Sequence, residues 1–183
     1  QGKYQHKPET PFIPGMEVSG KICSIGLNVK EFDVGDRVAG LTQLGGYAEI
    51  TKVNKKSIYK MPNSMSHDEA CAMLCAYGTS HYALKQRAKI KNGETLAVLG
   101  ASGSTGIAAI QIGKIYGAKV IAASSSKEKQ DFTKKLGADI SIGYENLKDD
   151  LKRITNGNGV DIIFDPVGGS LFETSSRALA RYG

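Results

Sequence analysis

Cysteine is scarce in this sequence, and its placement argues against two classes of cysteine-dependent protein. The chain has three cysteines, an odd number, at positions Cys23, Cys71 and Cys75, and no two of them have the Cys-x-x-Cys spacing. Small secreted domains are held together by several disulfides, and structural zinc sites use closely spaced cysteine or histidine ligands. The composition therefore favours a reducing compartment, and we expect a cytoplasmic location.

Long apolar runs are also missing. No stretch approaches the roughly 20 apolar residues that a membrane-spanning helix requires, so we expect no membrane partner. Residues 1–14 are polar and contain prolines, which is not the pattern of a secretory signal peptide. The chain does not begin with methionine, and we expect it to be a fragment of a longer protein.

Side-chain arrangements that perform catalysis by themselves are absent as well. His6, His67 and His81 have no recognisable catalytic partners, and we expect His81 to be a surface or packing residue. Neither a Ser-His-Asp triad nor a pair of catalytic carboxylates can be picked out. The sequence therefore identifies no catalytic residue.

Positive charge is present but dispersed, with a formal net charge of +6 over 183 residues. The lysines are scattered, with pairs at positions 55–56 and 134–135, and aromatic residues do not alternate with them. A solvated basic surface explains this pattern better than a nucleic-acid site. RNA binding remains an alternative that a salt series would test.

Residues 95–129 contain the most informative pattern in the chain. An apolar run at 96–99 predicts a buried strand, and a turn of small residues follows at 100–106. Apolar residues then recur at helical spacing, Gly117 predicts the helix end, and the run at 120–123 predicts a second strand. Strand, glycine-rich turn, helix and strand in this order are typical of a dinucleotide-binding unit.

The turn at 100–106, which we call the phosphate turn, has the residues that pyrophosphate binding requires. Phosphate binds bare backbone N–H groups at a helix N-terminus, and Gly103 permits that close approach. Gly106 would let the helix pack against the strand. Ala101 replaces the first glycine of the Gly-x-Gly-x-x-Gly pattern, so the motif alone is a weak signal. Its position between two predicted buried strands makes it a strong one. A glycine-rich turn that binds nothing is the alternative.

Short strands punctuated by glycine are predicted before residue 66, typical of a small β-barrel lobe. The expected strands lie within residues 16–25, at 37–40 and at 47–53. Ser66 and Glu69 form a capping box that begins a helix. We expect Gly78 to interrupt that helix and residues 79–87 to form a second helical piece.

Helices and strands alternate after the dinucleotide-binding unit. The expected elements are a helix from a Ser125–Glu128 capping box to Leu136, a strand at 139–142, a helix at 147–154, a strand at 160–164 and a helix from Ser170. This alternation predicts a parallel, doubly wound sheet. Four strands are expected, whereas a full dinucleotide-binding fold has six.

Six motifs give the chain a resemblance to the medium-chain dehydrogenase/reductases, in their zinc-independent quinone oxidoreductase (zeta-crystallin-like) branch. They are PGMEVSG at 14–20, VGDRV at 34–38, GGYAE at 45–49, AYGT at 76–79, GASGSTG at 100–106 and FDPVGG at 164–169. The resemblance implies an α/β protein. A partial GroES-like β-barrel lobe would occupy residues 1–75, and a truncated Rossmann-type doubly wound parallel sheet would occupy residues 76–183.

Zinc is not expected. Zinc-dependent members of the family have a catalytic histidine where this chain has Met16, and a thioether is a poor zinc ligand. The four-cysteine zinc lobe of those relatives has no room between residues 37–40 and 45–47. Cys75 falls near another ligand position, and we interpret it as a packed helix cysteine.

The end of the second Rossmann strand favours NADPH over NADH. NAD-binding sheets carry an acid there, whereas this chain has Ser124, followed by Ser125 and Ser126. Hydroxyls donate to phosphate, and Lys127 and Lys129 are nearby cations. The resemblance matches Lys129 and Tyr144 with residues beside the 2′-phosphate. For Lys127 and Lys129, an exposed position on a helix is an equally good explanation.

The resemblance extends the cofactor site to other segments. Thr79 matches a position near the nicotinamide carboxamide, with a helix cap after Gly78 as a compatible alternative, and Val167 and Gly168 match the loop near the ribose. The expected cofactor-binding residues are Thr79, Ala101, Ser102, Gly103, Ser104, Thr105, Gly106, Ser124, Ser125, Lys129, Tyr144, Val167 and Gly168.

The implied activity is NADPH-dependent reduction of a quinone or a related conjugated carbonyl by hydride transfer. A 2-alkenal or enoyl reductase of the same superfamily and a non-catalytic, NADPH-binding crystallin-like protein are the alternatives. The full-length protein is expected to be a homodimer. The 183-residue piece is expected to turn over poorly and to bind NADPH weakly, because two strands and part of the barrel would be missing.

Overall fold

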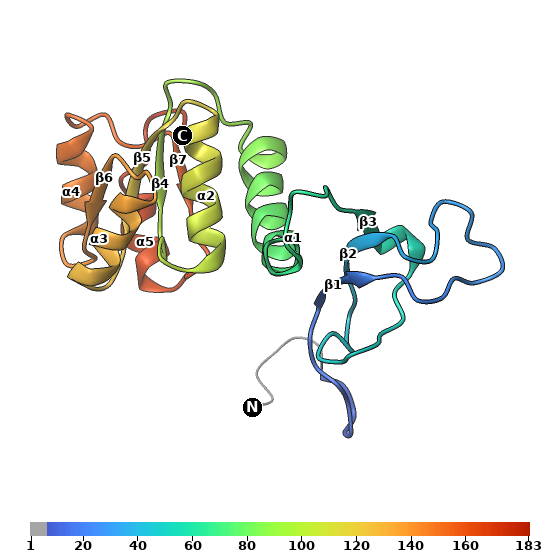
Figure 1. Cartoon of the computed structure of the whole chain (residues 1–183). Helices are drawn as coiled ribbons and strands as arrows, with labels where there is room; N and C mark the ends of the chain where they lie inside the picture. Colours follow the sequence, from blue (N-terminus) through green and yellow to red (C-terminus); the bar gives the residue numbers. More distant parts are fainter. Residues whose placement is uncertain (1–6) are drawn as a thin grey trace. The chain divides into compact units, whose positions relative to one another are not determined.

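The computed structural model describes residues 7–183, and the chain divides into two compact units, Gln1–Cys75 and Ala76–Gly183. Figure 1 colours the first unit from blue to green and the second from green to red. In the part of the chain that is described, no helix is both long and apolar enough to cross a membrane.

The N-terminal unit is built on a small antiparallel sheet with the strand order β1-β2-β3. Its strands are β1 (Glu17–Lys21), β2 (Arg37–Leu41) and β3 (Ile58–Lys60), and the 3-10 turn η1 (Lys55–Ser57) precedes β3. Gly40 in β2 is required by close packing, because a Cβ there would lie 2.6 Å from Cγ2 of Ile58 and 2.7 Å from the carbonyl oxygen of Ser57.

The predicted strand at 47–53 was wrong, and the strand expected within residues 16–25 is shorter than the apolar run. Residues 47–53 form an irregular segment instead of a strand, and β1 ends at Lys21 although the apolar run continues. The backbone N–H of Tyr47 binds the carbonyl of Pro14, while the side chains of Tyr47 and Ile50 are 78% and 77% exposed. A strand needs one buried face, and these exposed side chains provide none. The three-residue strand β3 was not predicted.

Helix α1 (His67–His81) begins at the predicted capping box. The N–H of Ser66 donates to Oε2 of Glu69 at 2.8 Å, and the N–H of Glu69 donates to Oγ of Ser66 at 3.1 Å. The helix continues through Gly78 and passes into a π-helical turn, η2 (Tyr82–Arg87). The predicted interruption was wrong, because one glycine costs a helix about 1 kcal/mol and does not force its end.

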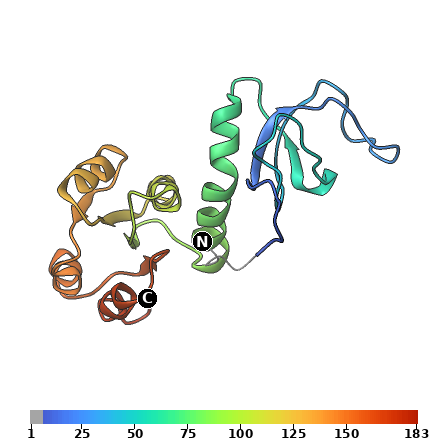
Figure 2. The ribbon, with the colours of Figure 1, turned by 90° about the horizontal axis from the view of Figure 1, so that it is seen from below.

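The C-terminal unit contains a parallel sheet in the order β6-β5-β4-β7. Its strands are β4 (Thr95–Val98), β5 (Lys119–Ala123), β6 (Ile140–Ile142) and β7 (Ile162–Phe164), and its helices are α2 (Ser104–Ile115), α3 (Lys127–Lys135), α4 (Leu147–Ile154) and α5 (Ser170–Ser176). Helices α2 and α3 lie on one face, and α4 and α5 lie on the other (Figure 2). This arrangement confirms the predicted doubly wound sheet.

Alternate residues of the sheet enter two separate core layers. Leu96 and Val98 of β4 pack in the layer that includes Ala108 and Ile112 of α2. Ala97 and Leu99 pack in the layer on the opposite face, which contains the buried leucines of α4. Both faces of a parallel sheet are covered by helices, so its strands are apolar throughout.

Helix α3 starts one residue later than the capping box had predicted. The cap is Ser126, whose backbone is extended and whose Oγ accepts a hydrogen bond from the N–H of Lys129 at 3.3 Å. Ser125 lies outside the helix and is exposed, so its hydroxyl is left for other contacts.

Candidate functional site

The phosphate turn connects β4 to α2 at the carboxyl edge of the sheet, and its shape depends on glycine. Gly100 has a φ of +58°, and its carbonyl accepts from the N–H of Gly103 at 2.9 Å. A Cβ on Gly106 would lie 2.5 Å from the oxygen of Gly100 and 2.7 Å from Cα of Ala101. Gly106 therefore brings α2 against the strand, as predicted.

The start of α2 offers backbone donors to a ligand. Gly103 is the N-cap and supplies no side-chain acceptor for the first N–H groups of the helix. Gly103 and Ser104 are exposed, and Ser102 and Thr105 are half-buried. N–H groups at a helix N-terminus lack partners within the helix and favour an anion there.

Ala101 contributes to the turn in a different way. Its side chain is fully buried, and its N–H donates to the carbonyl of Ala123 at the end of β5, at 3.2 Å. Ala101 thus joins the turn to the neighbouring strand, and its own N–H is already used.

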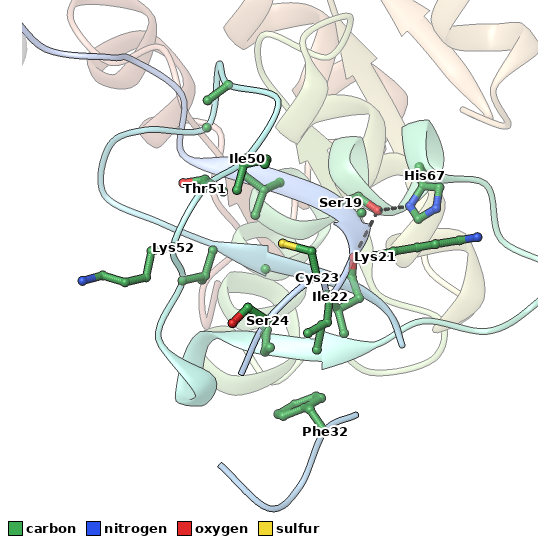
Figure 3. A pocket seen from close by; sticks show the side chains of 18 of the residues that line it. Ser19, Lys21, Ile22, Cys23, Ser24, Phe32, Ile50, Thr51, Lys52 and His67 are labelled. Atoms are coloured by element: carbon green, nitrogen blue, oxygen red, sulfur yellow. Dashed lines mark hydrogen bonds between the residues drawn. The ribbon is translucent and has the colours of Figure 1, made fainter. Parts of the chain in front are cut away.

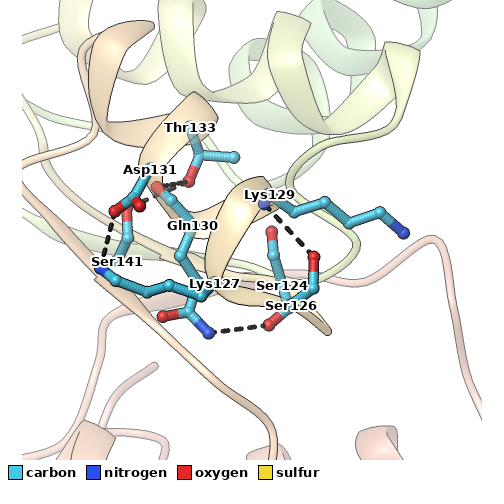
Figure 4. Close-up of polar contacts among 8 residues, drawn as sticks. All are labelled: Ser124, Ser126, Lys127, Lys129, Gln130, Asp131, Thr133 and Ser141. Atoms are coloured by element: carbon cyan, nitrogen blue, oxygen red, sulfur yellow. Dashed lines mark hydrogen bonds and ion pairs between the residues drawn. The ribbon is translucent and has the colours of Figure 1, made fainter.

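The serines after β5 have unequal surroundings. Figure 4 draws two of them, Ser124 and Ser126, beside residues of α3. Ser124 is 1% exposed, and its Oγ has no hydrogen-bond partner within the described residues. Ser125 is exposed, and its Oγ accepts from Nζ of Lys129 at 3.4 Å. Nothing in the sequence distinguishes the two hydroxyls. In the structure, Ser125 is accessible to a ligand and Ser124 is not.

Lys127 and Lys129, the two lysines in the first turn of α3, also have unequal surroundings. Nζ of Lys127 forms an ion pair with Asp131 at 2.6 Å, within the same helix. Lys129 is exposed, and no carboxylate pairs with it anywhere in residues 7–183. The cation next to Ser125 is therefore not neutralised by a carboxylate, and it can pair with an anion.

Tyr144 lies after β6 and reaches the phosphate turn. Its hydroxyl accepts a hydrogen bond from the N–H of Gly100 at 3.0 Å and donates one to the carbonyl of Ala123 at 3.2 Å. The ring packs against the core layer that contains Ile142 and Leu147. The hydroxyl of Tyr144 is therefore hydrogen-bonded to the backbone of the phosphate turn.

The loop after β7 lies beside the same turn. Oδ1 of Asp165 accepts from the N–H groups of Val167 and Gly168 at 2.8 and 2.9 Å, which folds the loop back on itself. A Cβ on Gly100 would meet Cγ2 of Val167 at 2.8 Å. The sequence reasoning did not assign Asp165 a role, although an aspartate that bonds backbone groups two and three residues on is a known turn signal.

Helix α1 contributes Ser80 to the turn, a residue that the sequence reasoning missed. Ser80 is fully buried, and its Oγ donates to the carbonyl of Thr105 at 2.8 Å. Thr79 is exposed within the helix, so the expected helix cap at this position was wrong. In the described part of the chain, no side-chain hydrogen bond joins Thr79 to the turn.

The N-terminal unit has a separate cavity of about 860 Å³ (Figure 3). Oγ of Ser19 lies 2.8 Å from Nδ1 of His67, and no carboxylate bonds to that ring within residues 7–183. Burial, and then the nearby charges of Glu17 and Asp68, raise the pKa of the Cys71 thiol. The raised pKa keeps the Cys71 thiol protonated near neutral pH. His6 lies outside the described residues.

Residues 7–183 contain no group of three or more His, Cys, Asp or Glu side chains arranged to hold a metal ion. Cys75 is exposed, so its interpretation as a packed cysteine was wrong. Its N–H donates to Oε1 of Glu17 at 2.8 Å, which ties the helix to β1. The absence of zinc stays a prediction.

Two family models match the chain in sequence order. The model described as "Alcohol dehydrogenase GroES-like domain" matches residues 1–63, and the one described as "Zinc-binding dehydrogenase" matches residues 104–183. Together they cover segments of both compact units.

Curated relatives resemble the chain over most or all of its length. Quinone oxidoreductase-like protein 2 homolog from Nematostella vectensis is 40% identical, over 100% of this chain and 51% of that protein. Quinone oxidoreductase from Homo sapiens is 35% identical, over 90% of this chain and 51% of that protein. The chain spans about half the length of the curated relatives it matches.

Solved structures share the fold. The quinone oxidoreductase of Escherichia coli in complex with NADPH has a TM-score of 0.93 and 31% identity, over 98% of this chain and 56% of that one. The CurK enoyl reductase has a TM-score of 0.87 and 30% identity, over 94% of this chain and 52% of that one.

Proposed function

The chain belongs to the medium-chain dehydrogenase/reductase superfamily, in its quinone oxidoreductase branch, and from that membership we propose an NADPH-dependent, zinc-independent oxidoreductase. Its substrates would be quinones or related conjugated carbonyls. NADPH would supply the hydride. The site residues would bind and orient the cofactor.

The observation that carries this proposal is the set of backbone donors at the start of α2, where the N-cap Gly103 supplies no side-chain acceptor. Ser125 and Lys129 follow β5 and bond each other, and β5 does not end in an acid. The N–H groups of the phosphate turn would hold the pyrophosphate. Ser125 and Lys129 would hold the 2′-phosphate through charge-assisted hydrogen bonds. Relatives in the same branch are named quinone oxidoreductases, and one solved relative binds NADPH.

The remaining expected cofactor residues keep their proposed places. Val167 and Gly168 would face the ribose from the loop beside Gly100. Thr79 would face the nicotinamide carboxamide from α1. Ser124 would occupy the position at which NAD-binding sheets have an acid. Because Ser124 is buried, its contribution would be the absence of a negative charge and not a contact with the phosphate.

Cofactor preference is the first prediction. NADPH should bind more tightly than NADH in a fluorescence titration, and Lys129→Met should weaken NADPH binding about tenfold while leaving NADH unchanged, because a charge-assisted hydrogen bond is lost. Lys127→Met is the matched control, since that lysine is already paired with Asp131. Equal affinity of the wild-type protein for the two cofactors would contradict the proposal.

An enoyl or 2-alkenal reductase activity is the second candidate, favoured by the similarity to the CurK enoyl reductase. Both activities transfer hydride to a conjugated carbonyl system, so the cofactor site does not separate them. NADPH oxidation should be followed with a quinone, a 2-alkenal and an enoyl thioester. The substrate with the highest kcat/KM decides between the two.

A further inference from the structure

We infer that Asp165 is a positioning residue of the nucleotide site, whose side chain holds the loop at residues 165–169 against the phosphate turn. We call this segment the ribose loop, because its residues Val167 and Gly168 would face the ribose. The inference rests on the proposed nucleotide-binding function. NADPH and NADH differ only in the 2′-phosphate, so a residue that positions the ribose loop should affect both cofactors equally.

A single side-chain oxygen organises the ribose loop. Oδ1 of Asp165 accepts from the N–H of Val167 at 2.8 Å and from the N–H of Gly168 at 2.9 Å. Pro166 has no N–H, so these two groups are the first backbone donors after Asp165. Aspartate and asparagine both close turns of this kind through a side-chain oxygen. Asp165 therefore determines the course of the chain where it leaves β7.

The backbone of the ribose loop has little conformational preference of its own. Gly168 and Gly169 have φ values of +73° and +64°. Glycine adopts positive and negative φ about equally readily, so its conformation must be held by contacts. Within residues 7–183, no backbone carbonyl accepts from the N–H of Val167 or of Gly168. The turn therefore depends on the side chain of Asp165.

The ribose loop packs directly on the start of the phosphate turn. The N–H of Leu99 donates to the carbonyl of Phe164 at 2.9 Å, so the loop and the turn leave the sheet from paired residues of β7 and β4. A Cβ on Gly100 would lie 2.8 Å from Cγ2 of Val167. The side chain of Val167 is still 52% exposed, which leaves part of it for a ligand.

Positioning requires the acceptor atom of Asp165 and not its charge. Asparagine keeps a carbonyl oxygen at Oδ1 and replaces Oδ2 with an amide nitrogen, which only donates. The turn should therefore survive in Asp165→Asn and be lost in Asp165→Ala. A ribose hydroxyl that donated directly to Oδ2 would lose its acceptor in both variants. Comparison of the two variants thus separates positioning from direct contact.

The test is a fluorescence titration of the wild-type protein, Asp165→Asn and Asp165→Ala with NADPH and with NADH. Both variants lack the negative charge. The Kd of Asp165→Ala should exceed that of Asp165→Asn by a factor of about three to ten for each cofactor, the loss expected for one hydrogen bond. Glu173→Ala is the matched control, because Glu173 is exposed on α5 and its carboxylate bonds no group in residues 7–183. It should change neither Kd.

The second readout is hydrogen exchange of the amides of Val167 and Gly168. Both should exchange more slowly than unprotected amides in the wild-type protein, and Asp165→Ala should accelerate both. The amide of Leu99, which bonds Phe164, should be unaffected, whereas a general loss of stability would accelerate all three. Should Asp165→Ala fail to fold, the wild-type measurement decides, and exchange of Val167 and Gly168 at an unprotected rate would overturn the inference.

The outcomes distinguish the inference from the function on which it rests. The positioning role is overturned, and the proposed function stands, if the wild-type protein prefers NADPH but Asp165→Ala binds both cofactors as tightly as Asp165→Asn does. An affinity loss confined to NADPH, or an equal loss in both variants, has the same consequence. A wild-type protein that binds neither cofactor overturns both.

Discussion

Two helical glycines, Gly106 and Gly78, show how differently single residues are constrained in this protein. Gly106 lies in the first turn of α2, where the backbone of residues 100 and 101 leaves no room for a Cβ. Gly78 lies inside α1 with no atom within 4 Å of the place where its Cβ would be. Both residues are glycines in helices, but close packing requires only the first of them.

Alanine at these two positions should therefore have opposite effects on stability. Gly106→Ala should lower the free energy of unfolding by about 1–3 kcal/mol, because α2 must move away from the phosphate turn. Gly78→Ala should be neutral or should raise it by up to about 1 kcal/mol, since alanine is the better helix former. Urea denaturation measures both, and a Gly106→Ala variant as stable as the wild type would contradict the packing argument.

Individual elements of the C-terminal unit are tied together by Asp139, which directly precedes β6. Its carboxylate accepts from Nζ of Lys114 on α2 at 2.7 and 2.8 Å, and from the N–H of Val120 on β5 at 2.7 Å. Burial acts to raise the pKa of Asp139, but the hydrogen bonds from Lys114 and Val120 outweigh it, so the pKa lies below its ordinary value.

Asp139→Asn should destabilise the protein by about 1 kcal/mol at pH 7, since the carboxylate is about a third exposed and its ion pair is partly screened. A carboxylate whose pKa is lower in the folded state than in the unfolded state stabilises the fold at pH values above its unfolded pKa. That stabilisation is lost as the pH falls through the folded-state pKa. The difference between wild type and variant should therefore shrink below about pH 4.

Asp131→Asn is the control for this prediction, because Asp131 makes an exposed ion pair within α3. It should cost less than about 0.5 kcal/mol at any pH. A stability difference for Asp139→Asn that stays constant between pH 7 and pH 3 would show that the charge of Asp139 is not responsible.

The start of α1 provides a second prediction at the scale of an element. Ser66→Ala removes the hydroxyl that accepts from the N–H of Glu69, and it should lower the free energy of unfolding by about 1 kcal/mol. Ser176→Ala is a suitable control, because that hydroxyl only bonds the carbonyl of Glu173 within its own helix. Equal stability of the two variants would argue against the capping box.

For the molecule as a whole, the metal content of the purified protein is the outstanding chemical question. We expect no bound zinc, because Met16 replaces the family's histidine and the four-cysteine lobe is missing from the sequence. Elemental analysis should find well under one zinc per chain, and chelation should leave activity unchanged. About one zinc per chain, with activity lost on chelation, would refute the prediction. The homodimer expected for the full-length protein likewise stays a prediction.

Local patterns in the sequence were sufficient for the parallel sheet and the phosphate turn. The bounds of α4, residues 147–154, agree with the prediction, as do the roles of Gly106 and Gly117 in packing and ending α2. These features depend on residues a few positions apart, through helical periodicity, glycine conformation and the order of strands and helices. Such short-range rules do not require knowledge of distant partners.

Tertiary structure decided which of the expected side chains reach the site. Tyr144 bonds Gly100 across 44 positions and Ser80 bonds Thr105 across 25, and only folding brings these pairs together. The irregular course of residues 47–53, whose side chains lack a buried face, and the burial of Ser124 were decided in the same way. A hydroxyl's partner and its exposure are properties of the packed chain, because both depend on backbone groups that arrive from other elements.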